Sequence, residues 1–306
     1  MSKILTSPSS FGQVGSEPVD LLVDNGYEVI NNPYGRKLTE DEVIELAKDC
    51  IGIVAGVEPL TPRVMDALPA LKCISRVGIG MDSVDLKYAA QKGITVTNTP
   101  NGPTRSVAEL TLAMTFALLR KIPQADADLK KRLWKKQTGN LLFNKVIGVV
   151  GLGRIGRLVS EMFRGLGNPV IGYDPYADAA WAESKGVNLV DFDTVLKTAD
   201  IITLHVPGNE DKSAVIGSKE FELIKSSAML INISRGGIVD EAALYDALTT
   251  KKIASAAIDV FNEEPYDGPL CDLENVVLTP HLGSYAEEGK LLMEIDAVNN
   301  LIAVLS

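Results

Sequence analysis

With 306 residues the chain exceeds the length at which a single hydrophobic core usually divides, so two domains are expected. Its composition, with 46% hydrophobic and 23% charged residues, is that of a globular protein and argues against a disordered or fibrous class. A net charge of −10 argues against nucleic acid and anionic membranes as partners, and any anionic substrate then needs a local cluster of arginines or backbone amides.

Short apolar runs alternate with amphipathic helical patterns along the chain. In the first part of the sequence this pattern predicts strands at residues 3–6, 27–30, 52–55, 73–76 and 95–97. In the second part it predicts six further strands, at residues 145–150, 170–173, 201–204, 230–233, 256–260 and 276–278. Because strands alternate with helices, we expect an α/β protein with two Rossmann-like, doubly wound parallel-sheet domains.

A segment rich in turn residues, at 98–105, separates the two series of strands. It precedes an apolar helical pattern at residues 107–119, and we interpret it as a crossover between domains. A further helical pattern begins at residue 287 and continues to residue 306. The sequence leaves open whether this tail packs on the second domain or returns to the first.

Three glycines, Gly151, Gly153 and Gly156, form a Gly-x-Gly-x-x-Gly motif between a predicted strand and a helical pattern. Such glycines permit a tight turn, a close approach of backbone to a pyrophosphate, and close packing of helix on strand. Asp174 ends the next predicted strand, about 20 residues on, where a carboxylate that binds the adenine ribose is expected. No arginine follows Asp174, so NAD is favoured over NADP. The alternative is an ordinary strand-to-helix turn, with Asp174 at the start of a loop.

Only two histidines occur, His205 and His281, and each follows a predicted strand. Both are expected at the carboxyl edge of a sheet, where open α/β sheets bind ligands, and either can titrate near neutral pH. The alternative is a strand-end histidine that only bonds the backbone. Arg235, in a Ser-Arg-Gly-Gly turn, offers the positive charge that a carboxylate substrate requires, unless it is an ordinary surface side chain.

Acidic residues close the next strand and the loop after it. Asp259 lies in the predicted strand at 256–260, and Glu263 and Glu264 follow in the loop. A carboxylate beside a histidine stabilises the imidazolium and so keeps a proton ready for donation. The residues alone do not decide between Glu263 and Glu264, because either can be a solvated surface charge.

The three cysteines, Cys50, Cys73 and Cys271, form no Cys-x-x-Cys pair, which is typical of reduced thiols. No metal site is predicted. The first ten residues lack the basic and apolar profile of a signal peptide, and no apolar run is long enough to span a bilayer. We therefore expect a cytoplasmic protein.

A series of specific motifs covers nearly the whole chain. They are Arg76-Val-Gly-Ile-Gly-Met-Asp-Ser-Val-Asp85, Asn98-Thr-Pro-Asn101, Val107-Ala-Glu-Leu110, Gly151-Leu-Gly-Arg-Ile-Gly156, Ile231-Asn-Ile-Ser-Arg-Gly-Gly-Ile-Val-Asp-Glu241, Asp259-Val-Phe-Asn-Glu-Glu-Pro265 and Pro280-His-Leu-Gly283. In this order they make the chain resemble the D-isomer-specific 2-hydroxyacid dehydrogenase family, and within it the phosphoglycerate dehydrogenase branch.

The resemblance implies hydride transfer between NAD(H) and a small 2-hydroxy or 2-oxo acid, with 3-phosphoglycerate among the candidate acids. It implies that Arg235 binds and polarises the substrate, that His281 is the acid and base, and that Glu264 pairs with His281. The implied cofactor-binding residues are Gly151, Gly153, Arg154, Ile155, Gly156, Asp174, His205, Val206, Pro207, Ile233, Ser234, Arg235, Asp259, His281 and Gly283. The implied substrate-binding residues are Gly56, Val77, Gly78, Arg235 and His281, with Val77 and Gly78 offering backbone amides to the substrate carboxylate.

The resemblance also implies how the chain is divided. Residues 1–98 plus 287–306 would form a flavodoxin-like substrate domain, and residues 99–286 an NAD-binding Rossmann domain. A homodimer is implied, with the apolar helix from Val107 at the subunit contact. One departure concerns the substrate: where phosphoglycerate enzymes often carry an Arg-Ser pair for the phosphate, this chain has Gly56-Val-Glu-Pro-Leu60, and Glu58 is unfavourable beside a phosphate.

Two alternative functions remain at this point. The first is a reductase of glyoxylate, hydroxypyruvate or another 2-oxo acid. The second belongs to a different class, an NADH-sensing binding protein like the family's transcriptional corepressors, which retain the same fold and residues. Turnover of any acid would distinguish an enzyme from the NADH-sensing binding protein.

Overall fold

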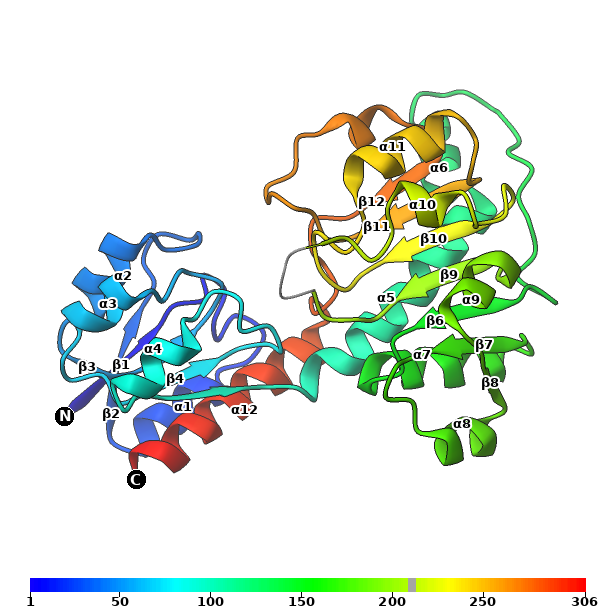
Figure 1. The fold of residues 1–306 in the computed structure, drawn as a ribbon. Coiled ribbons are helices and arrows are strands. Elements are labelled where there is room, and N and C mark those ends of the chain that lie inside the picture. Colours follow the sequence, from blue (N-terminus) through cyan, green and yellow to red (C-terminus); the bar gives the residue numbers. More distant parts are fainter. Residues whose placement is uncertain (209–212) are drawn as a thin grey trace. The chain divides into compact units, whose positions relative to one another are not determined.

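The computed structural model describes residues 1–208 and 213–306, and the chain divides into two units (Figure 1). Unit 1 comprises Met1–Ser106 and Ser284–Ser306, and unit 2 comprises Val107–Gly283. The sequence analysis placed these divisions after residues 98 and 286.

Helix α5 (Gly102–Arg120) begins five residues before the predicted helical pattern. The first boundary between the units falls within this helix, after Ser106. Pro103 lies in the first turn of the helix, where its missing N–H costs no hydrogen bond. Gly102 packs closely on helix α12 (Glu287–Leu305): a Cβ at this position would lie 2.4 Å from Cγ of Met293. The first turn of α5 therefore belongs to unit 1.

Unit 1 is built on a five-stranded parallel sheet with the order β2-β1-β3-β4-β5. Its strands are β1 (Ser2–Thr6), β2 (Tyr27–Asn31), β3 (Cys50–Ala55), β4 (Cys73–Arg76) and β5 (Thr95–Asn98). Its helices, besides α12 and the start of α5, are α1 (Glu17–Asp24), α2 (Glu40–Ala47), α3 (Pro62–Ala67) and α4 (Leu86–Gln91). This strand order is flavodoxin-like, as expected.

Apolar side chains bury both faces of this sheet. Neighbouring residues of β1 point to opposite sides: Ile4 packs with Ala297 and Leu301 of α12, whereas Leu5 packs with Val43 of α2. Both strand residues are fully buried. The C-terminal helix, for which the sequence left two alternatives, is therefore part of the core of unit 1, where it runs beside α1 (Figure 1).

Unit 2 is built on a seven-stranded parallel sheet with the order β12-β11-β10-β9-β6-β7-β8. Its strands are β6 (Ile147–Val150), β7 (Val170–Tyr173), β8 (Val187–Leu189), β9 (Ile201–Leu204), β10 (Met229–Asn232), β11 (Ser255–Ile258) and β12 (Val276–Leu278). Its helices are most of α5, α6 (Ile122–Lys130), α7 (Arg154–Gly165), α8 (Ala179–Lys185), α9 (Phe192–Thr198), α10 (Ser218–Phe221), α11 (Glu241–Thr249) and the short 3-10 helix η1 (Pro269–Asp272).

One strand, β8, was not predicted from the sequence. It has three residues at the edge of the sheet, and of these only Val187 is buried. So short a segment has no apolar run or alternation that distinguishes it from a loop. Its pairing with β7 is a consequence of the tertiary fold.

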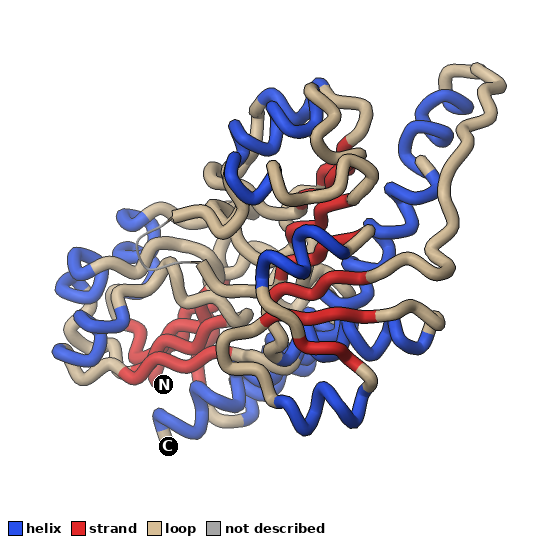
Figure 2. The backbone as a smooth tube through the Cα atoms, turned by 45° about the vertical axis from the view of Figure 1, so that its right-hand side comes forward, coloured by secondary structure: helices blue, strands red, loops and turns tan. Residues whose placement is uncertain are grey.

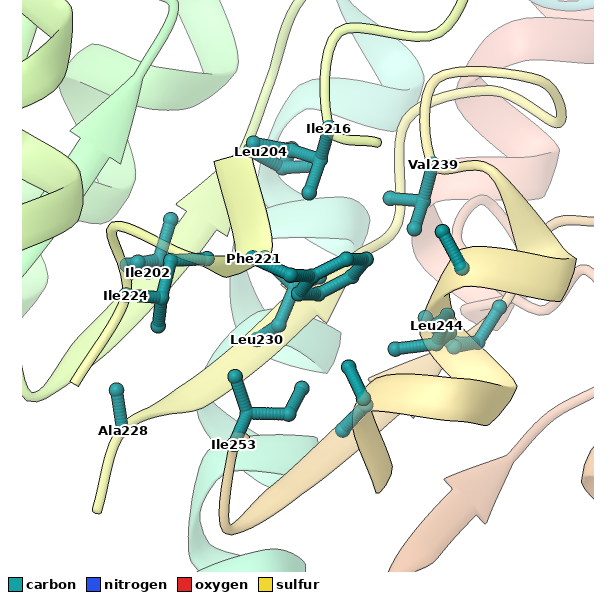
Figure 3. Close-up of a cluster of buried hydrophobic side chains, with 14 of the residues drawn as sticks. Ile202, Leu204, Ile216, Phe221, Ile224, Ala228, Leu230, Val239, Leu244 and Ile253 are labelled. Atoms are coloured by element: carbon teal, nitrogen blue, oxygen red, sulfur yellow. The ribbon is translucent and has the colours of Figure 1, made fainter. Parts of the chain in front are cut away.

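Two apolar clusters bury the faces of the sheet in unit 2, and helices flank the strands on both sides (Figure 2). Leu230 of β10 belongs to one cluster, and its neighbour Ile231 belongs to the other. In the first cluster, Phe221 of α10 lies among Leu230, Ile253 and other aliphatic side chains (Figure 3). The sheet is thus closed to water on both faces, and only its edges and ends are available for function.

No helix in the described part of the chain combines the length and apolar character needed to cross a bilayer.

The position of Phe221 yields a test of this core. Replacing Phe221 with Ala is expected to lower the free energy of unfolding by about 3–5 kcal/mol, because it removes a buried ring that is 2% exposed and leaves a cavity. The measurement is chemical denaturation monitored by circular dichroism. The matched control, Tyr176→Ala, removes a ring that is 92% exposed and should leave stability almost unchanged. Equal effects of the two substitutions would contradict the assignment.

Candidate functional site

The carboxyl ends of the parallel strands in unit 2 bring the candidate residues to one edge of the sheet. Gly151 follows β6, Asp174 follows β7, and His205 follows β9. On the other side, Arg235 follows β10 and Asp259 follows β11. The chain passes from β8 at one edge back to β9 beside β6, so the switch in direction lies between β6 and β9. Open α/β sheets bind ligands at such a switch point.

The glycine loop after β6 has the close contacts that its sequence predicts. Gly151 has φ of +91°, and a Cβ there would lie 2.4 Å from the carbonyl oxygen of His205. A Cβ at Gly156 would lie 1.9 Å from the carbonyl oxygen of Gly151. By contrast, no atom lies within 4 Å of a Cβ added at Gly153, so its backbone borders open space. These are the conditions for a backbone turn that admits a pyrophosphate.

The N-terminus of α7 follows this loop directly. Gly153 is the N-cap, and no side chain caps the helix, so the first amides, including those of Arg154 and Ile155, are open to an anion. Asp174 accepts hydrogen bonds from the N–H of Leu152 at 2.8 Å and of Tyr176 at 2.7 Å. The carboxylate therefore holds the glycine loop at the end of β7, a connection that the sequence did not indicate.

The two histidines lie in different environments. His205 is desolvated, and burial lowers its pKa to about 3, so its ring is neutral at physiological pH. The Nε2 atom of this ring is 2.9 Å from Oγ1 of Thr203. A ring that stays neutral and faces its own strand is unsuited to proton transfer. The carbonyl group of His205 and Cγ1 of Val206 lie within 3 Å of where a Cβ at Gly151 would be, so this segment packs against the glycine loop.

His281 forms the contact that distinguishes it from His205. Its Nδ1 lies 2.8 Å from Oε2 of Glu264, and the side chains of both residues are partly exposed. The other oxygen, Oε1 of Glu264, accepts a hydrogen bond from the N–H of Phe261 at 3.1 Å. The structure thus pairs the histidine with Glu264 and not with Glu263, an alternative that the residues alone left open. Engagement of Nδ1 leaves Nε2 as the nitrogen available for proton transfer.

Asp259 holds the loop that carries His281. It is completely buried, and it accepts hydrogen bonds from Oγ1 of Thr279 at 2.6 Å, the N–H of Leu282 at 2.7 Å and the N–H of Gly283 at 2.9 Å. Burial raises the pKa of Asp259, while these hydrogen bonds and the nearby His281 act against the rise. The sequence analysis assigned Asp259 to the cofactor, and the structure adds this second connection.

The arginine turn is fixed by a residue that sequence reasoning missed. Asn232, at the end of β10, donates to the carbonyl oxygen of Arg235 at 3.0 Å and accepts from the N–H and hydroxyl of Ser234. A Cβ at Gly236 would lie 2.0 Å from the carbonyl oxygen of Phe261. The signal available in the sequence was an asparagine directly before a glycine-rich turn. Arg235 is therefore presented by a turn with little freedom, next to the buried side chain of Ile233.

In unit 1 the structure shows hydrogen bonds made by three residues that were predicted to bind the substrate. The N–H of Val77 donates to the carbonyl oxygen of Ala55 at 2.9 Å, and that of Gly78 donates to Oγ1 of Thr99 at 2.7 Å. The N–H of Gly56 is directed at Oγ of Ser7 and at Oε1 of Glu58. These amides donate within unit 1, and the substrate contacts implied for Gly56, Val77 and Gly78 stay predictions.

Comparison with known proteins identifies the family. Residues 112–283, which cover nearly all of unit 2, match the D-isomer specific 2-hydroxyacid dehydrogenase family, NAD binding domain. The chain belongs to this family. NAD is accordingly the cofactor of unit 2, and the open backbone at Gly153 and the uncapped start of α7 fit its pyrophosphate.

Similar proteins agree with this family. The chain is 41% identical to D-3-phosphoglycerate dehydrogenase of Archaeoglobus fulgidus, over 91% of this chain and 53% of that protein. It is 45% identical to D-3-phosphoglycerate dehydrogenase of Methanocaldococcus jannaschii, over 83% of this chain and 49% of that protein. The chain thus spans about half the length of the curated relatives it matches.

Solved structures match the chain over nearly its full length. The TT0316 protein from Thermus thermophilus has a TM-score of 0.90 and 31% identity, over 99% of this chain and 96% of that chain. D-Lactate dehydrogenase from Aquifex aeolicus, in complex with NAD and lactic acid, has a TM-score of 0.85 and 27% identity, over 99% of this chain and 95% of that chain.

The position of Asp174 in this family yields a prediction on cofactor choice. Asp174→Ala removes the carboxylate that would accept from the adenine ribose and repel a 2′-phosphate. The affinity for NADH is expected to fall about tenfold, since a hydrogen bond to a charged group is lost, and use of NADPH is expected to rise relative to NADH. Fluorescence titration with both cofactors measures this. Asp193→Ala, an exposed acid on α9, is the control, and an unchanged NADH affinity in Asp174→Ala would refute the assignment.

Proposed function

We propose that the protein is an NAD-dependent D-2-hydroxyacid dehydrogenase that moves a hydride between NAD(H) and a small 2-hydroxy or 2-oxo acid. The observation that carries this proposal is the contact between Glu264 and His281, 2.8 Å long, at the sheet edge where Arg235 also lies. A paired histidine supplies a proton, and an arginine binds a carboxylate. Family membership supports the combination.

The proposed cofactor contacts follow from the same edge. The glycine loop and the start of α7 would hold the pyrophosphate, through Gly151, Gly153, Arg154, Ile155 and Gly156. Asp174 would accept from the adenine ribose. The remaining proposed contacts lie at the carboxyl ends of β9, β10, β11 and β12. They are His205, Val206, Pro207, Ile233, Ser234, Arg235, Asp259, His281 and Gly283.

In the proposed reaction the cofactor supplies the hydride when bound. The carboxylate of Glu264 accepts from Nδ1 of His281 and orients the ring, so Nε2 is the nitrogen that donates a proton to the substrate carbonyl oxygen. Arg235 binds the substrate carboxylate and stabilises the negative charge that develops on the carbonyl oxygen. In the reverse direction, neutral His281 accepts the hydroxyl proton, and Arg235 keeps the same role.

The names of similar proteins support a range of small acids. They include D-3-phosphoglycerate dehydrogenases at 37–45% identity and solved structures of a pyruvate reductase and D-lactate dehydrogenases. We propose that unit 1 acts as the substrate domain and that the acid is one of this class, with 3-phosphoglycerate, hydroxypyruvate and glyoxylate among the candidates. Three unpaired cysteines and the absence of a membrane-spanning helix among the described residues support a cytoplasmic location.

The test of this function is His281→Ala. Loss of the proton donor is expected to lower kcat by about 10²- to 10⁴-fold while NADH binding is retained, and steady-state NADH oxidation with a panel of 2-oxo acids measures it. Glu264→Gln should also lower kcat, and the neighbouring substitution Glu263→Gln is its matched control. Undiminished turnover in His281→Ala would refute the role of the histidine. NADH binding without turnover of any acid by the unaltered protein would favour the NADH-sensing function instead.

We also propose that the protein is a homodimer whose contact lies on the segment of unit 2 from residue 116 to residue 143. Large hydrophobic side chains are exposed along this segment: Phe116, Ile122, Leu129, Leu133, Trp134, Leu141 and Phe143. Trp134 is 82% exposed and Leu141 is 70% exposed. Exposed apolar side chains of this size are typical of an interaction surface.

Introducing charged residues into the segment 116–143 tests whether it forms the dimer contact. The double substitution Trp134→Asp/Leu141→Asp is expected to convert a dimer to a monomer, because each carboxylate would have to be buried unpaired in an apolar contact. Sedimentation velocity measures the mass in solution. Tyr176→Asp, which places the same charge on another exposed ring, should leave the dimer intact. A monomeric unaltered protein, or a dimer that survives the double substitution, would contradict the proposed contact.

A further inference from the structure

Unit 1 contains a buried carboxyl group that the proposed reaction does not use. Glu58 follows β3 and is 2% exposed. Strands β1 and β3 are neighbours, but the chain leaves β1 toward β2 on one side and returns to β3 on the other. The loops after β1 and β3 therefore diverge at a switch point, which is where an open α/β sheet binds its ligand.

Glu58 connects these two loops. Ser7, directly after β1, donates its hydroxyl hydrogen to Oε1 of Glu58. The N–H of Gly56 is directed at the same Oε1 at 3.0 Å and at Oγ of Ser7 at 2.9 Å. A Cβ at Gly56 would lie 2.9 Å from Oε2 of Glu58, so a side chain at position 56 would require the Glu58 carboxyl to shift.

The groups around Glu58 are those that bind anions. They are the hydroxyl of Ser7, the N–H of Gly56 and the guanidinium of Arg76, which ends the neighbouring strand β4 and is 9% exposed. Burial raises the pKa of Glu58, whereas the hydrogen bonds from Ser7 and Gly56 and the positive charge of Arg76 lower it. The carboxyl therefore satisfies, from within the protein, a set of donors that an anionic ligand would otherwise use.

We propose that Glu58 determines specificity: its carboxyl occupies an anion site at the β1/β3 switch point of unit 1 and excludes substrates that carry a phosphate. This inference rests on the proposed dehydrogenase function and narrows its substrates to unphosphorylated 2-oxo acids. A phosphate dianion at this site would meet the Glu58 carboxyl, and the donors it requires are already engaged. A methyl or hydroxymethyl group requires neither a cation nor those donors.

The first experiment compares hydroxypyruvate with phosphohydroxypyruvate in steady-state NADH oxidation. The unaltered protein is expected to prefer hydroxypyruvate in kcat/KM. Glu58→Ala is expected to shift the ratio of the two values toward the phosphorylated acid by about tenfold or more, since a phosphate gains hydrogen bonds from Ser7 and Gly56 and the charge of Arg76. Glu45→Ala, which removes an exposed acid from α2 in the same unit, should leave the ratio unchanged. A preference for the phosphorylated acid, or the same ratio in Glu58→Ala, would overturn the inference.

The second experiment does not depend on activity. Inorganic phosphate, compared with chloride at equal ionic strength, is expected to raise the melting temperature of Glu58→Ala in a saturable way and to leave the unaltered protein and Glu45→Ala unchanged. Adding Ser7→Ala to Glu58→Ala should weaken this protection. If Glu58→Ala does not fold, Glu58→Ser opens the same space and keeps a hydroxyl for its buried neighbours.

The two experiments separate the inference from the function on which it rests. If the unaltered protein reduces neither these two acids nor any other acid of the 2-oxo acid panel, the dehydrogenase function fails, and protection by phosphate alone then decides whether Glu58 occupies an anion site. Protection confined to the Glu58 variants would support that occupancy. Equal protection of all variants, or of none, would refute it.

Discussion

All strands of unit 2 run in the same direction, and the arrangement of the candidate site depends on this constraint. Their carboxyl ends meet at one edge, so the glycine loop after β6, the arginine turn after β10 and the loop after β12 become neighbours although they are distant along the chain. Apolar clusters bury both faces of the sheet. A slip of one residue in a strand would exchange its side chains between the two clusters and disrupt the packing of both, and this cost fixes the register and with it the position of each loop.

Buried carboxyl groups then fix the loops at these strand ends. A carboxyl removed from water must accept hydrogen bonds, and it holds the donors that provide them. Asp259 holds the backbone of Leu282 and Gly283, directly after His281, and so orients the loop that presents the histidine. Glu58 holds Ser7 and Gly56 in unit 1 by the same kind of interaction. Hydrogen bonds to a buried carboxyl group thus orient the His281 loop in unit 2 and hold the loops around Glu58 in unit 1.

The acidic composition of the chain makes the local placement of positive charge important. With a net charge of −10, the protein repels small anions at long range. Arg235 and the uncapped start of α7 provide attraction at the edge of unit 2, whereas Arg76 in unit 1 is accompanied by Glu58. The balance of charge therefore differs between the two strand-end regions.

The sequence by itself determined the α/β class and most strands, because buried parallel strands are apolar runs separated by helical patterns. The flavodoxin-like order of the first sheet was implied by the resemblance to the family. The sequence also determined the glycine loop, since the spacing of three glycines reflects steric limits within a few residues. The tertiary structure shows the contact between Glu264 and His281, which the residues alone left open and the resemblance implied. Only the tertiary structure shows that burial lowers the pKa of His205 and that the amides of Val77 and Gly78 donate within unit 1. It also decided that the C-terminal helix packs in unit 1. The physical reason is that hydrogen bonds and burial depend on neighbours supplied by distant segments, which no local pattern of residues specifies.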